Sequence, residues 1–330
     1  MDDSQGLRGS ERALEEHRKG RCMIRTFDLT KRYKNLLALD RLNMTVEEGD
    51  IYGYIGPNGA GKTTTLKILA TLLEPTSGAA TICGYRVGKD NKHIRPLIGY
   101  MPDFFGVYED MRVDEYLTFF AAAYRIHGER RKRIVDDVLE LTDLGGKRDA
   151  MVESLSRGMQ QRLGLARALV HDPKVLILDE PSSGLDPRAR IEMRALLKEL
   201  KKMGKTILIS SHILSELQEL CNKVGIIEKG TLLFSGDTVE VRRQIRKGTS
   251  IDVRVSGDNE PARAALEAHP LVKSAVAENG CIRVSLSEDA KDHTFIARFL
   301  IERGFAIELL RQEEPNLEDV FMRVTKGVVA

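Results

Sequence analysis

The sequence has no tryptophan and only four cysteines, and none of the cysteines forms a CxxC pair. They lie far apart, at Cys22, Cys83, Cys221 and Cys281. This spacing offers neither a zinc site nor a disulfide framework, and it suits a reducing compartment. The longest mostly apolar stretch, residues 116–126, is shorter than the roughly 20 residues of a membrane-spanning helix. We therefore expect a chain that does not itself cross a membrane.

An excess of charge of one sign is absent too. Charged residues make up 30% of the chain, yet the formal net charge is only +2. No overall field therefore favours nucleic acid or an anionic membrane surface as a partner. Residues 1–21 are polar and charged without an apolar stretch, which predicts an N-terminal extension rather than a secretory signal. A length of 330 residues favours two domains.

A glycine-rich loop is the first positive signal. GPNGAGKTT fits the pattern G-x-x-x-x-G-K-[ST] between an expected strand at 51–55 and an expected helix at 64–73. Its residues are Gly56, Pro57, Asn58, Gly59, Ala60, Gly61, Lys62, Thr63 and Thr64. The glycines let backbone N–H groups turn toward phosphate oxygens, Lys62 suits the β- and γ-phosphates, and the Thr63 hydroxyl suits Mg²⁺. Taken alone, the loop has an ordinary glycine turn as its alternative.

Two acidic residues and a histidine stand where further strands are expected to end. Residues 175–178 form a continuous apolar run, typical of a strand buried in a parallel sheet, and Asp179 and Glu180 follow it directly. Folds with such sheets bind ligands at this edge. Asp179 suits the Mg²⁺ shell, Glu180 the attacking water, and His212 the γ-phosphate. The alternatives are two solvated carboxylates and a surface histidine.

The remaining chain divides into a first domain at 22–240 and a second at 241–330. The first begins with two or three expected antiparallel strands at 22–46, contains a mostly helical part at about 104–165 with a break at Gly128, and ends in a hairpin near 236. Within it, a helix is expected to begin inside the segment LSRGMQQR, with Ser156 as its N-cap. A basic helix is expected at 238–247. The second domain has the order β-α-β-β-α-β, which resembles a ferredoxin-like unit, and a last helix at 316–324.

Together these segments resemble the ATP-binding cassette (ABC) family, specifically the nucleotide-binding subunit of a bacterial exporter-type transporter. The resemblance covers about residues 23–236. It implies an α/β fold: a P-loop NTPase core with antiparallel β and α-helical subdomains, followed by a small α+β ferredoxin-like accessory domain. It also implies ATP and Mg²⁺ as cofactors, with Lys62, Glu180 and His212 as catalytic residues.

In that family the segment matching residues 155–160 is the signature, which faces the γ-phosphate held by a partner subunit. Ser156 and Gly158 are its close-approach positions. Since the chain has one phosphate loop and one signature, the resemblance implies a head-to-tail homodimer, or a dimer with a closely related subunit, that encloses two ATP. It further implies that Tyr33 stacks on adenine and that Asp186 lies at the dimer seam.

Two residues depart from the family pattern. The signature reads SRGMQ where SGGQ is common, so Arg157 adds a charge between two retained small residues. Asp103 stands where a glutamine usually contacts Mg²⁺ and the attacking water. Aspartate remains a hard oxygen ligand, but it is shorter and adds a negative charge near the γ-phosphate. Slower hydrolysis or an indirect metal contact is therefore expected.

The closing segment EPNLEDVFMRVT is similar to the tail of exporter ATPases whose membrane subunit is a separate chain. The resemblance thus implies an ATPase, peripheral on the cytoplasmic face of the membrane, that powers export through a transmembrane permease subunit by ATP-driven dimer closure. In the family a short helix of the membrane subunit docks near the region that holds Phe104, Phe105, Phe119 and Phe120 here. No nucleic-acid partner is expected.

Two other functions stay open. A soluble ABC-type protein acting on nucleic acid or ribosomes is one, although the single cassette and the near-neutral charge count against it. A slow-turnover nucleotide-dependent regulator is the other, because of Asp103. Glu180 and His212 count against the regulator, since a switch without catalysis needs neither.

Overall fold

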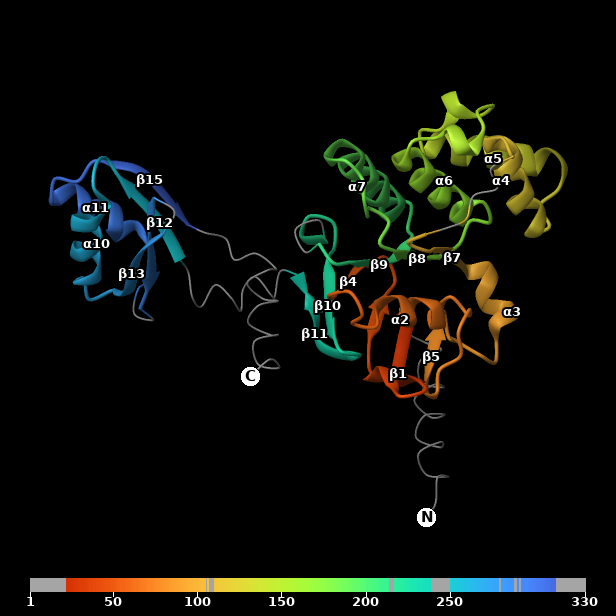
Figure 1. Cartoon of the computed structure of the whole chain (residues 1–330), viewed down its shortest axis with the longest axis horizontal. Coiled ribbons are helices and arrows are strands. Elements are labelled where there is room, and N and C mark those ends of the chain that lie inside the picture. The colour runs from red at the N-terminus through yellow and green to blue at the C-terminus, as the bar shows by residue number, and fades with distance from the viewer. Residues whose placement is uncertain are drawn as a thin grey trace, which may run out of the picture. The chain divides into compact units, whose positions relative to one another are not determined.

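The computed structural model describes residues 22–104, 106, 110–213, 217–238, 250–278, 280–287, 290 and 292–312. The N-terminal extension at 1–21, Phe105, nearly all of the basic helix expected at 238–247 and the last helix expected at 316–324 lie outside these residues. The chain forms two compact units, Met1–Asp237 and Thr238–Ala330, which are described separately (Figure 1).

A six-stranded sheet forms the centre of the first unit. Its strands, in spatial order, are β11 (Thr231–Asp237), β10 (Lys223–Glu228), β4 (Ile51–Ile55), β9 (Thr206–Ser211), β8 (Val175–Asp179) and β7 (Ile98–Met101). All are parallel except β11, which pairs antiparallel with β10 in the predicted hairpin. Every residue of β4, β8 and β9 is buried, as continuous apolar strands in a parallel sheet require.

A second, antiparallel sheet accounts for the strands expected near the N-terminus. It has the order β2-β1-β5-β6, with β3 also paired to β1. The strands are β1 (Cys22–Tyr33), β2 (Leu36–Leu42), β3 (Thr45–Glu47), β5 (Ser77–Ile82) and β6 (Tyr85–Arg86). Helix α2 (Lys62–Leu69) contributes Leu66 to one buried apolar cluster with Ile24 of β1 and Val175 of β8. The helix therefore joins the two sheets through a shared core.

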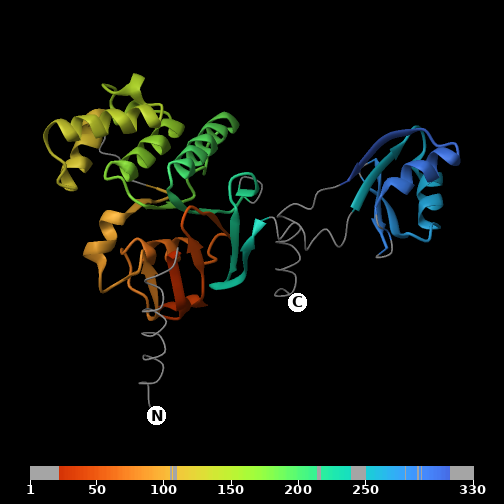
Figure 2. The same ribbon diagram turned by 180° about the vertical axis from the view of Figure 1, so that it is seen from behind.

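The helical part of this unit includes the two helices predicted around Gly128. They are α4 (Val113–Ala123) and α5 (Gly128–Leu141); α3 (Asn91–Ile94), η2 (Arg95–Leu97), η3 (Gly145–Lys147) and η4 (Val152–Ser154) are short turns. Next come α6 (Arg157–Leu169) and α7 (Pro187–Lys202). Figures 1 and 2 show α4, α5 and α6 on the side of the six-stranded sheet opposite β1 and β5.

The bounds of two expected helices differ from the structure. Helix α2 ends at Leu69 rather than Leu73, and it begins at Lys62 rather than Thr64, because Gly61 has a left-handed φ of 110° that lets the helix start at once. The helix expected at 211–221 is wrong at both ends, since β9 continues through Ser211 and Cys221 lies outside any helix. Among the described residues, no helix combines the length and apolar character needed to span a bilayer.

The second unit has the predicted ferredoxin-like order. Its elements are β12 (Ser250–Val255), α10 (Asn259–Glu267), β13 (Val272–Glu278), β14 (Cys281–Leu286), α11 (Thr294–Glu302) and β15 (Ile307–Gln312). The strands form an antiparallel sheet in the order β13-β14-β12-β15. One face of the sheet supplies Val253 and Val284 to a core that also holds Leu266 of α10 and Leu300 of α11.

Candidate active site at the ends of the parallel strands

The glycine loop between β4 and α2 has room for phosphate but little for side chains. A Cβ at Gly56 would lie 2.3 Å from the carbonyl oxygen of Ile227, and one at Gly61 would lie 2.7 Å from that of Ala38. Gly59 has a φ of 82°, which favours glycine. Pro57, Asn58 and Gly59 are exposed, whereas Gly56 and Ala60 are buried. The two ends of the loop are thus packed against the protein, and its middle is open to solvent.

The start of α2 has no side-chain cap. The first N–H groups of a helix have no intrahelical partner, and the helix dipole adds positive potential there. Thr63 is exposed at this end, Thr64 is half-buried, and the first turn contains no acidic residue. Such a helix start is suited to an anion.

Lys62 reaches back into the loop that precedes it. Its Nζ donates to the carbonyl oxygens of Gly56 at 2.6 Å and Pro57 at 3.3 Å. It also forms an ion pair with Oε1 of Glu180 at 3.3 Å, although the side chains are only 6% and 12% exposed. Two partly desolvated charges from β4–α2 and β8 therefore meet here.

Glu180 lies between Lys62 and His212. Its Oε2 is 2.8 Å from Nδ1 of His212, which follows β9, so the carboxylate has a basic neighbour on each oxygen. Glu180 has a φ of 50° although it is not glycine and precedes Pro181. A left-handed conformation costs an L-residue about 1–2 kcal/mol, and such strain clusters at functional sites. The local fold thus holds the Glu180 carboxylate in place by means of a strained backbone conformation.

Asp179, the last residue of β8, is 1% exposed. Its Oδ1 accepts a 2.6 Å hydrogen bond from the Ser210 hydroxyl, whose oxygen in turn accepts from the Glu180 backbone N–H at 3.0 Å. Within the described residues, the buried Oδ2 has no hydrogen-bond partner. A buried carboxylate oxygen without a partner is costly, and a cation would satisfy it.

Asp103 follows β7 at the same edge and is exposed. Partial burial raises the pKa of its carboxyl, and the negative charges of Asp179 and Glu180 raise it further. The positive charges of Arg157 and His212 act in the opposite direction on the same pKa. Burial, followed by the charge of Asp179, also raises the pKa of Tyr100 to about 12. The predicted acidic residues therefore belong to one electrostatic neighbourhood.

The signature segment packs on the segment after Glu180. Ser156 caps α6 as predicted, since its Oγ accepts from the Met159 N–H at 3.4 Å. A Cβ on Gly158 would lie 3.2 Å from Cβ of Ala189 in α7, so the two helix starts approach closely. Asp186 is exposed and caps α7 by accepting from the Ala189 N–H at 2.9 Å.

Tyr33 ends β1 and is 42% exposed, with the Lys31 ammonium 5.3 Å from its ring centroid. It pairs with Leu36 across the turn into β2, the strand whose Ala38 carbonyl abuts Gly61. Among the described residues, no hydrogen bond, ion pair or ring contact joins the Tyr33 side chain to the loop. Its predicted adenine contact remains a prediction.

Sequence comparisons agree with this geometry. The family described as "ABC transporter" matches residues 39–183, and that described as "ATP-binding protein DrrA1-3-like, C-terminal domain" matches residues 236–325. The bacitracin transport ATP-binding protein BcrA of Bacillus licheniformis is 39% identical over 309 residues, covering 92% of this chain and 98% of BcrA. The chain belongs to the ABC transporter ATP-binding proteins. As such it binds ATP and hydrolyses it as a transporter subunit.

Further ABC relatives include exporter and resistance proteins. The Nod factor export ATP-binding protein I of Burkholderia pseudomallei (strain 1710b) is 36% identical, covering 89% of this chain and 94% of that protein. The linearmycin resistance ATP-binding protein LnrL of Bacillus subtilis (strain 168) is 30% identical, covering 92% and 98%.

Solved structures of ABC proteins share the fold of the first unit. An ATP-binding subunit of an ABC transporter superposes with a TM-score of 0.61 at 31% identity, covering 68% of this chain and 93% of that one. The ATP-binding cassette MJ0796, solved as a dimer in a post-hydrolysis state with ADP and Pi, gives 0.60 at 26% identity, covering 66% and 99%. The predicted P-loop NTPase fold is thereby confirmed.

Sequence reasoning missed Ser210, which connects Asp179 to the Glu180 backbone in this ABC site. The only signal was a hydroxyl at the end of an apolar strand, two residues before His212. Such a residue has no motif of its own, because its partner comes from a neighbouring strand.

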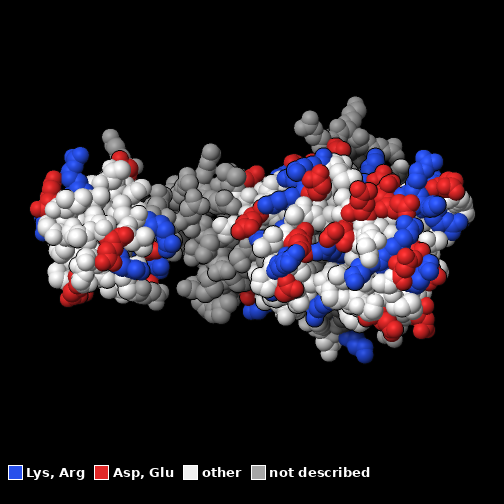
Figure 3. Space-filling model, turned by 90° about the horizontal axis from the view of Figure 1, so that it is seen from above, with Lys and Arg blue, Asp and Glu red and all other residues white. Residues whose placement is uncertain are grey.

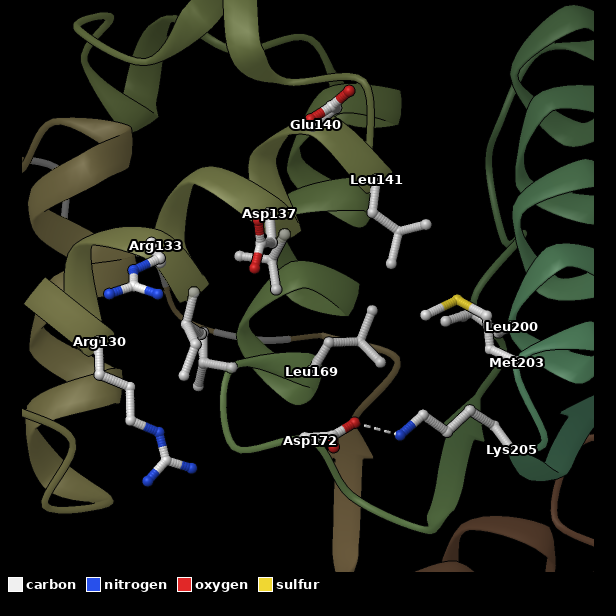
Figure 4. Close-up of a pocket in the computed structure, with 13 residues that line it drawn as sticks. Arg130, Arg133, Asp137, Glu140, Leu141, Leu169, Asp172, Leu200, Met203 and Lys205 are labelled. Carbon is white, nitrogen blue, oxygen red and sulfur yellow. Dashed lines mark hydrogen bonds and ion pairs between the residues drawn. The ribbon is translucent and has the colours of Figure 1, made fainter.

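A large cavity of the ABC unit lies elsewhere. It has a volume of about 890 Å³, and no candidate site residue lines it. Figure 4 shows Arg130 and Arg133 of α5 on one wall, Leu200 and Met203 across from them, and the ion pair of Lys205 with Asp172 below. A large cavity in this unit is therefore not by itself a sign of the nucleotide site.

Proposed function

We propose that this chain powers export through a separate transmembrane subunit, and that two copies close head-to-tail around two ATP. The names of BcrA, the Nod factor protein and LnrL support an exporter or resistance system. The dimeric MJ0796 structure supports the paired arrangement. The chain would then lie at the cytoplasmic face of the membrane, with residues 22–240 as the nucleotide-binding domain and 241–330 as an accessory domain.

The observation that carries the catalytic assignment is the position of Glu180 between Lys62 and His212. A carboxylate held beside phosphate-binding residues can orient and polarise an attacking water. Lys62 would then bind the β- and γ-phosphates, which requires it to exchange its Glu180 contact for phosphate oxygens. His212 would donate to the γ-phosphate and counter the charge that develops there.

Mg²⁺ would be held by Thr63 and Asp179, with Asp103 as a further oxygen ligand. The partnerless Oδ2 of Asp179 and the exposed Thr63 hydroxyl fit a hard cation. Among the described residues, no three His, Cys, Asp or Glu side chains cluster to hold a metal by themselves. The ion would therefore depend on nucleotide oxygens, and bound Mg²⁺ would neutralise phosphate charge.

The remaining binding roles follow the same arrangement. The loop from Gly56 to Thr64 would surround the phosphates, and Tyr33 would stack on adenine. Ser156 and Gly158 would face the γ-phosphate in the other copy, with Asp186 at the seam. The exposure of Ser156 and Asp186 supports an interface at this surface.

A groove of about 430 Å³ offers a docking place for the membrane subunit. Its lining includes Leu72, Tyr100, Phe120, Tyr124 and His171. Leu72 and Tyr124 are 62% and 40% exposed, and the Tyr124 ring stacks on His171 with centroids 3.8 Å apart. An exposed apolar and aromatic groove of this kind suits the apolar face of a short helix. The intermixed basic and acidic side chains that Figure 3 shows on the larger unit favour no nucleic-acid track on that face.

Steady-state ATP hydrolysis with Mg²⁺ tests the catalytic proposal, comparing the native chain with Glu180→Gln. Removing a general base typically costs about 10²–10⁴-fold in rate, so turnover should nearly vanish while ATP still binds. Glu199→Gln, an exposed position on α7, is the matched control and should hydrolyse as the native chain does.

Turnover of the native chain should rise more than linearly with its concentration, since the complete site needs two copies. A stable ATP-bound dimer of the Glu180→Gln chain, detected by size-exclusion chromatography, would support the closed state. Native-like hydrolysis by Glu180→Gln would overturn the assignment of this base.

A further inference from the structure

The Arg157 side chain occupies an unusual position on the turn after Glu180. A Cβ built on Gly184 would lie 2.3 Å from Cζ of Arg157, 2.5 Å from Nη2 and 2.7 Å from Nη1. Three atoms of the guanidinium thus lie over Gly184, where any side chain would stand. Gly184 also has a φ of 68°, so its conformation and this contact both require glycine.

The turn beneath Arg157 is continuous with the proposed base. The Ser183 N–H donates to the Glu180 carbonyl at 3.0 Å, and the Leu185 N–H donates to the Ser182 carbonyl at 3.3 Å. From the α7 side, Nε of Arg190 donates to the Leu185 carbonyl at 2.9 Å. Arg157 contacts the same turn from the α6 side, so two arginines from two helices hold it.

Among the described residues, no ion pair or hydrogen bond explains the position of the Arg157 side chain. Within the described part of the chain, its guanidinium has neither an ion pair nor a hydrogen bond, and the residue is exposed. A guanidinium is planar and weakly hydrated, and it stacks on flat groups in a way that a lysine ammonium does not. Packing over a glycine peptide uses that property.

We propose that Arg157 is a positioning residue, whose guanidinium holds the 181–186 turn against the start of α6 and thereby keeps Glu180 aimed at the nucleotide. This inference rests on the proposed role of Glu180. Arg157 itself touches no reacting atom. Its neighbours Ser156 and Gly158 would contact nucleotide in the other copy, so the turn is attached to that binding surface.

A double-mutant cycle on the full chain tests the contact, with Arg157→Ala, Gly184→Ala and both changes together. Small displacements of a catalytic group cost up to about 100-fold, so we expect kcat to fall about tenfold in Arg157→Ala with little change in KM for MgATP. Gly184→Ala displaces the guanidinium and also strains a left-handed backbone position, so its loss of kcat should be at least as large. The double variant should be no worse than Gly184→Ala alone, because the contact with Arg157 is already lost there.

Two further variants separate packing from charge. Arg157→Lys keeps the charge without the planar group, so its kcat should stay close to that of Arg157→Ala. Arg133→Ala, on α5 at the distant cavity, is the matched control and should hydrolyse ATP at the native rate. Native-like kcat in Arg157→Ala or Arg157→Lys, or losses that multiply in the double variant, would overturn the proposal.

Hydrogen exchange gives a readout that does not depend on turnover. The amides of residues 183–186 should exchange faster in Arg157→Ala than in the native chain, and those of α5 should not change. Unchanged exchange in the turn would refute the contact even if kcat fell. Persistent hydrolysis in Glu180→Gln would instead refute the proposed base and leave the exchange result to decide on Arg157.

Discussion

Two of the buried aspartates, Asp179 of the first unit and Asp252 of the second, have opposite surroundings. Asp252 of β12 is 6% exposed and lies 3.2 Å from a guanidinium nitrogen of Arg311 and 3.6 Å from one of Arg283. Asp179 of β8 is 1% exposed, yet one of its oxygens has no hydrogen-bond partner among the described residues. Asp252 is satisfied by side chains of its own unit, whereas Asp179 keeps one buried oxygen without a partner among the described residues.

Two helix starts, those of α10 and α2, show a similar difference. Helix α10 of the second unit is capped by Asp258, whose carboxylate accepts from the Glu260 N–H at 3.0 Å. Helix α2 of the first unit has no such cap. Unsatisfied polar groups are costly in a folded chain, so they persist where a ligand completes them. For these two helices, one start is left open at the proposed nucleotide site and the other is capped by its own chain.

The largest difference between the two aspartates is expected when each is replaced by asparagine, beginning with Asp179. Asp179→Asn should lower ATP turnover about a hundredfold, since loss of a metal-orienting group typically costs 10–100-fold in metal affinity or activity. The free energy of unfolding should not fall, because a buried charge with one unsatisfied oxygen is replaced by a neutral amide. Steady-state hydrolysis over a Mg²⁺ titration measures the effect, with Asp252→Asn as the matched control. Native turnover in Asp179→Asn would remove the metal assignment.

Exposed apolar residues of the two units should also differ in effect. Phe104 is 86% exposed in the first unit, and Ile301 of α11 is 63% exposed in the second. Phe104→Ala should weaken assembly with the membrane subunit about tenfold, as truncation of an aromatic anchor commonly does, without changing ATP affinity. Ile301→Ala should change neither.

The fraction of the chain recovered with membranes, and nucleotide binding to the purified chain, measure these two quantities. Equal loss of both in Phe104→Ala would end the docking assignment. Phe105, for which the same result is predicted from sequence, lies outside the described residues.

A smaller effect is expected at Asp252. Asp252→Asn should reduce the free energy of unfolding of the second unit by about 1 kcal/mol, since Arg283 and Arg311 are partly exposed and the pairs are screened. ATP turnover should stay native. Thermal unfolding followed by circular dichroism measures the stability, because the chain has no tryptophan to report it. An unchanged stability would mean that the second unit does not depend on this pair.

The smallest effect concerns acid stability near α11. The hydroxyl and backbone N–H of Thr294 donate to Asp292 and lower the pKa of its carboxyl. The Asp292 carboxylate therefore stabilises the fold above the ordinary aspartate pKa of about 3.9. This stabilisation is lost as the pH falls through the lowered pKa that Asp292 has in the folded chain. The difference in thermal midpoint between the native chain and Asp292→Ala should shrink below about pH 4. A difference that is constant from pH 7 to pH 3 would contradict this.

Motifs with local causes could be predicted from sequence. The loop from Gly56 to Thr64 and the cap at Ser156 depend on short-range geometry, since a glycine or a capping hydroxyl acts on its own neighbours. The apolar run at β8 likewise indicated a buried parallel strand. The ferredoxin-like order of the second unit also followed from the alternation of elements.

Errors arose where distant residues decide. The helix expected at 211–221 was predicted to start too early, because β9 continues through Ser211, which pairs with Ile55 of β4. The sequence did not predict the hydrogen bond of Ser210 to Asp179 or the contact of Arg157 with Gly184, because each partner comes from another segment of the chain.

The sequence by itself determined the chemical groups of the site and their order along the chain. Glycines, a lysine and carboxylates at strand ends are local features that short-range sterics and patterning fix. Only the tertiary structure decided which of these groups meet, because sheet order alone brings the ends of β4, β8 and β9 together. It also decided that, among the described residues, one oxygen of Asp179 has no partner while Asp252 is paired, since burial and partners are properties of packing rather than of composition.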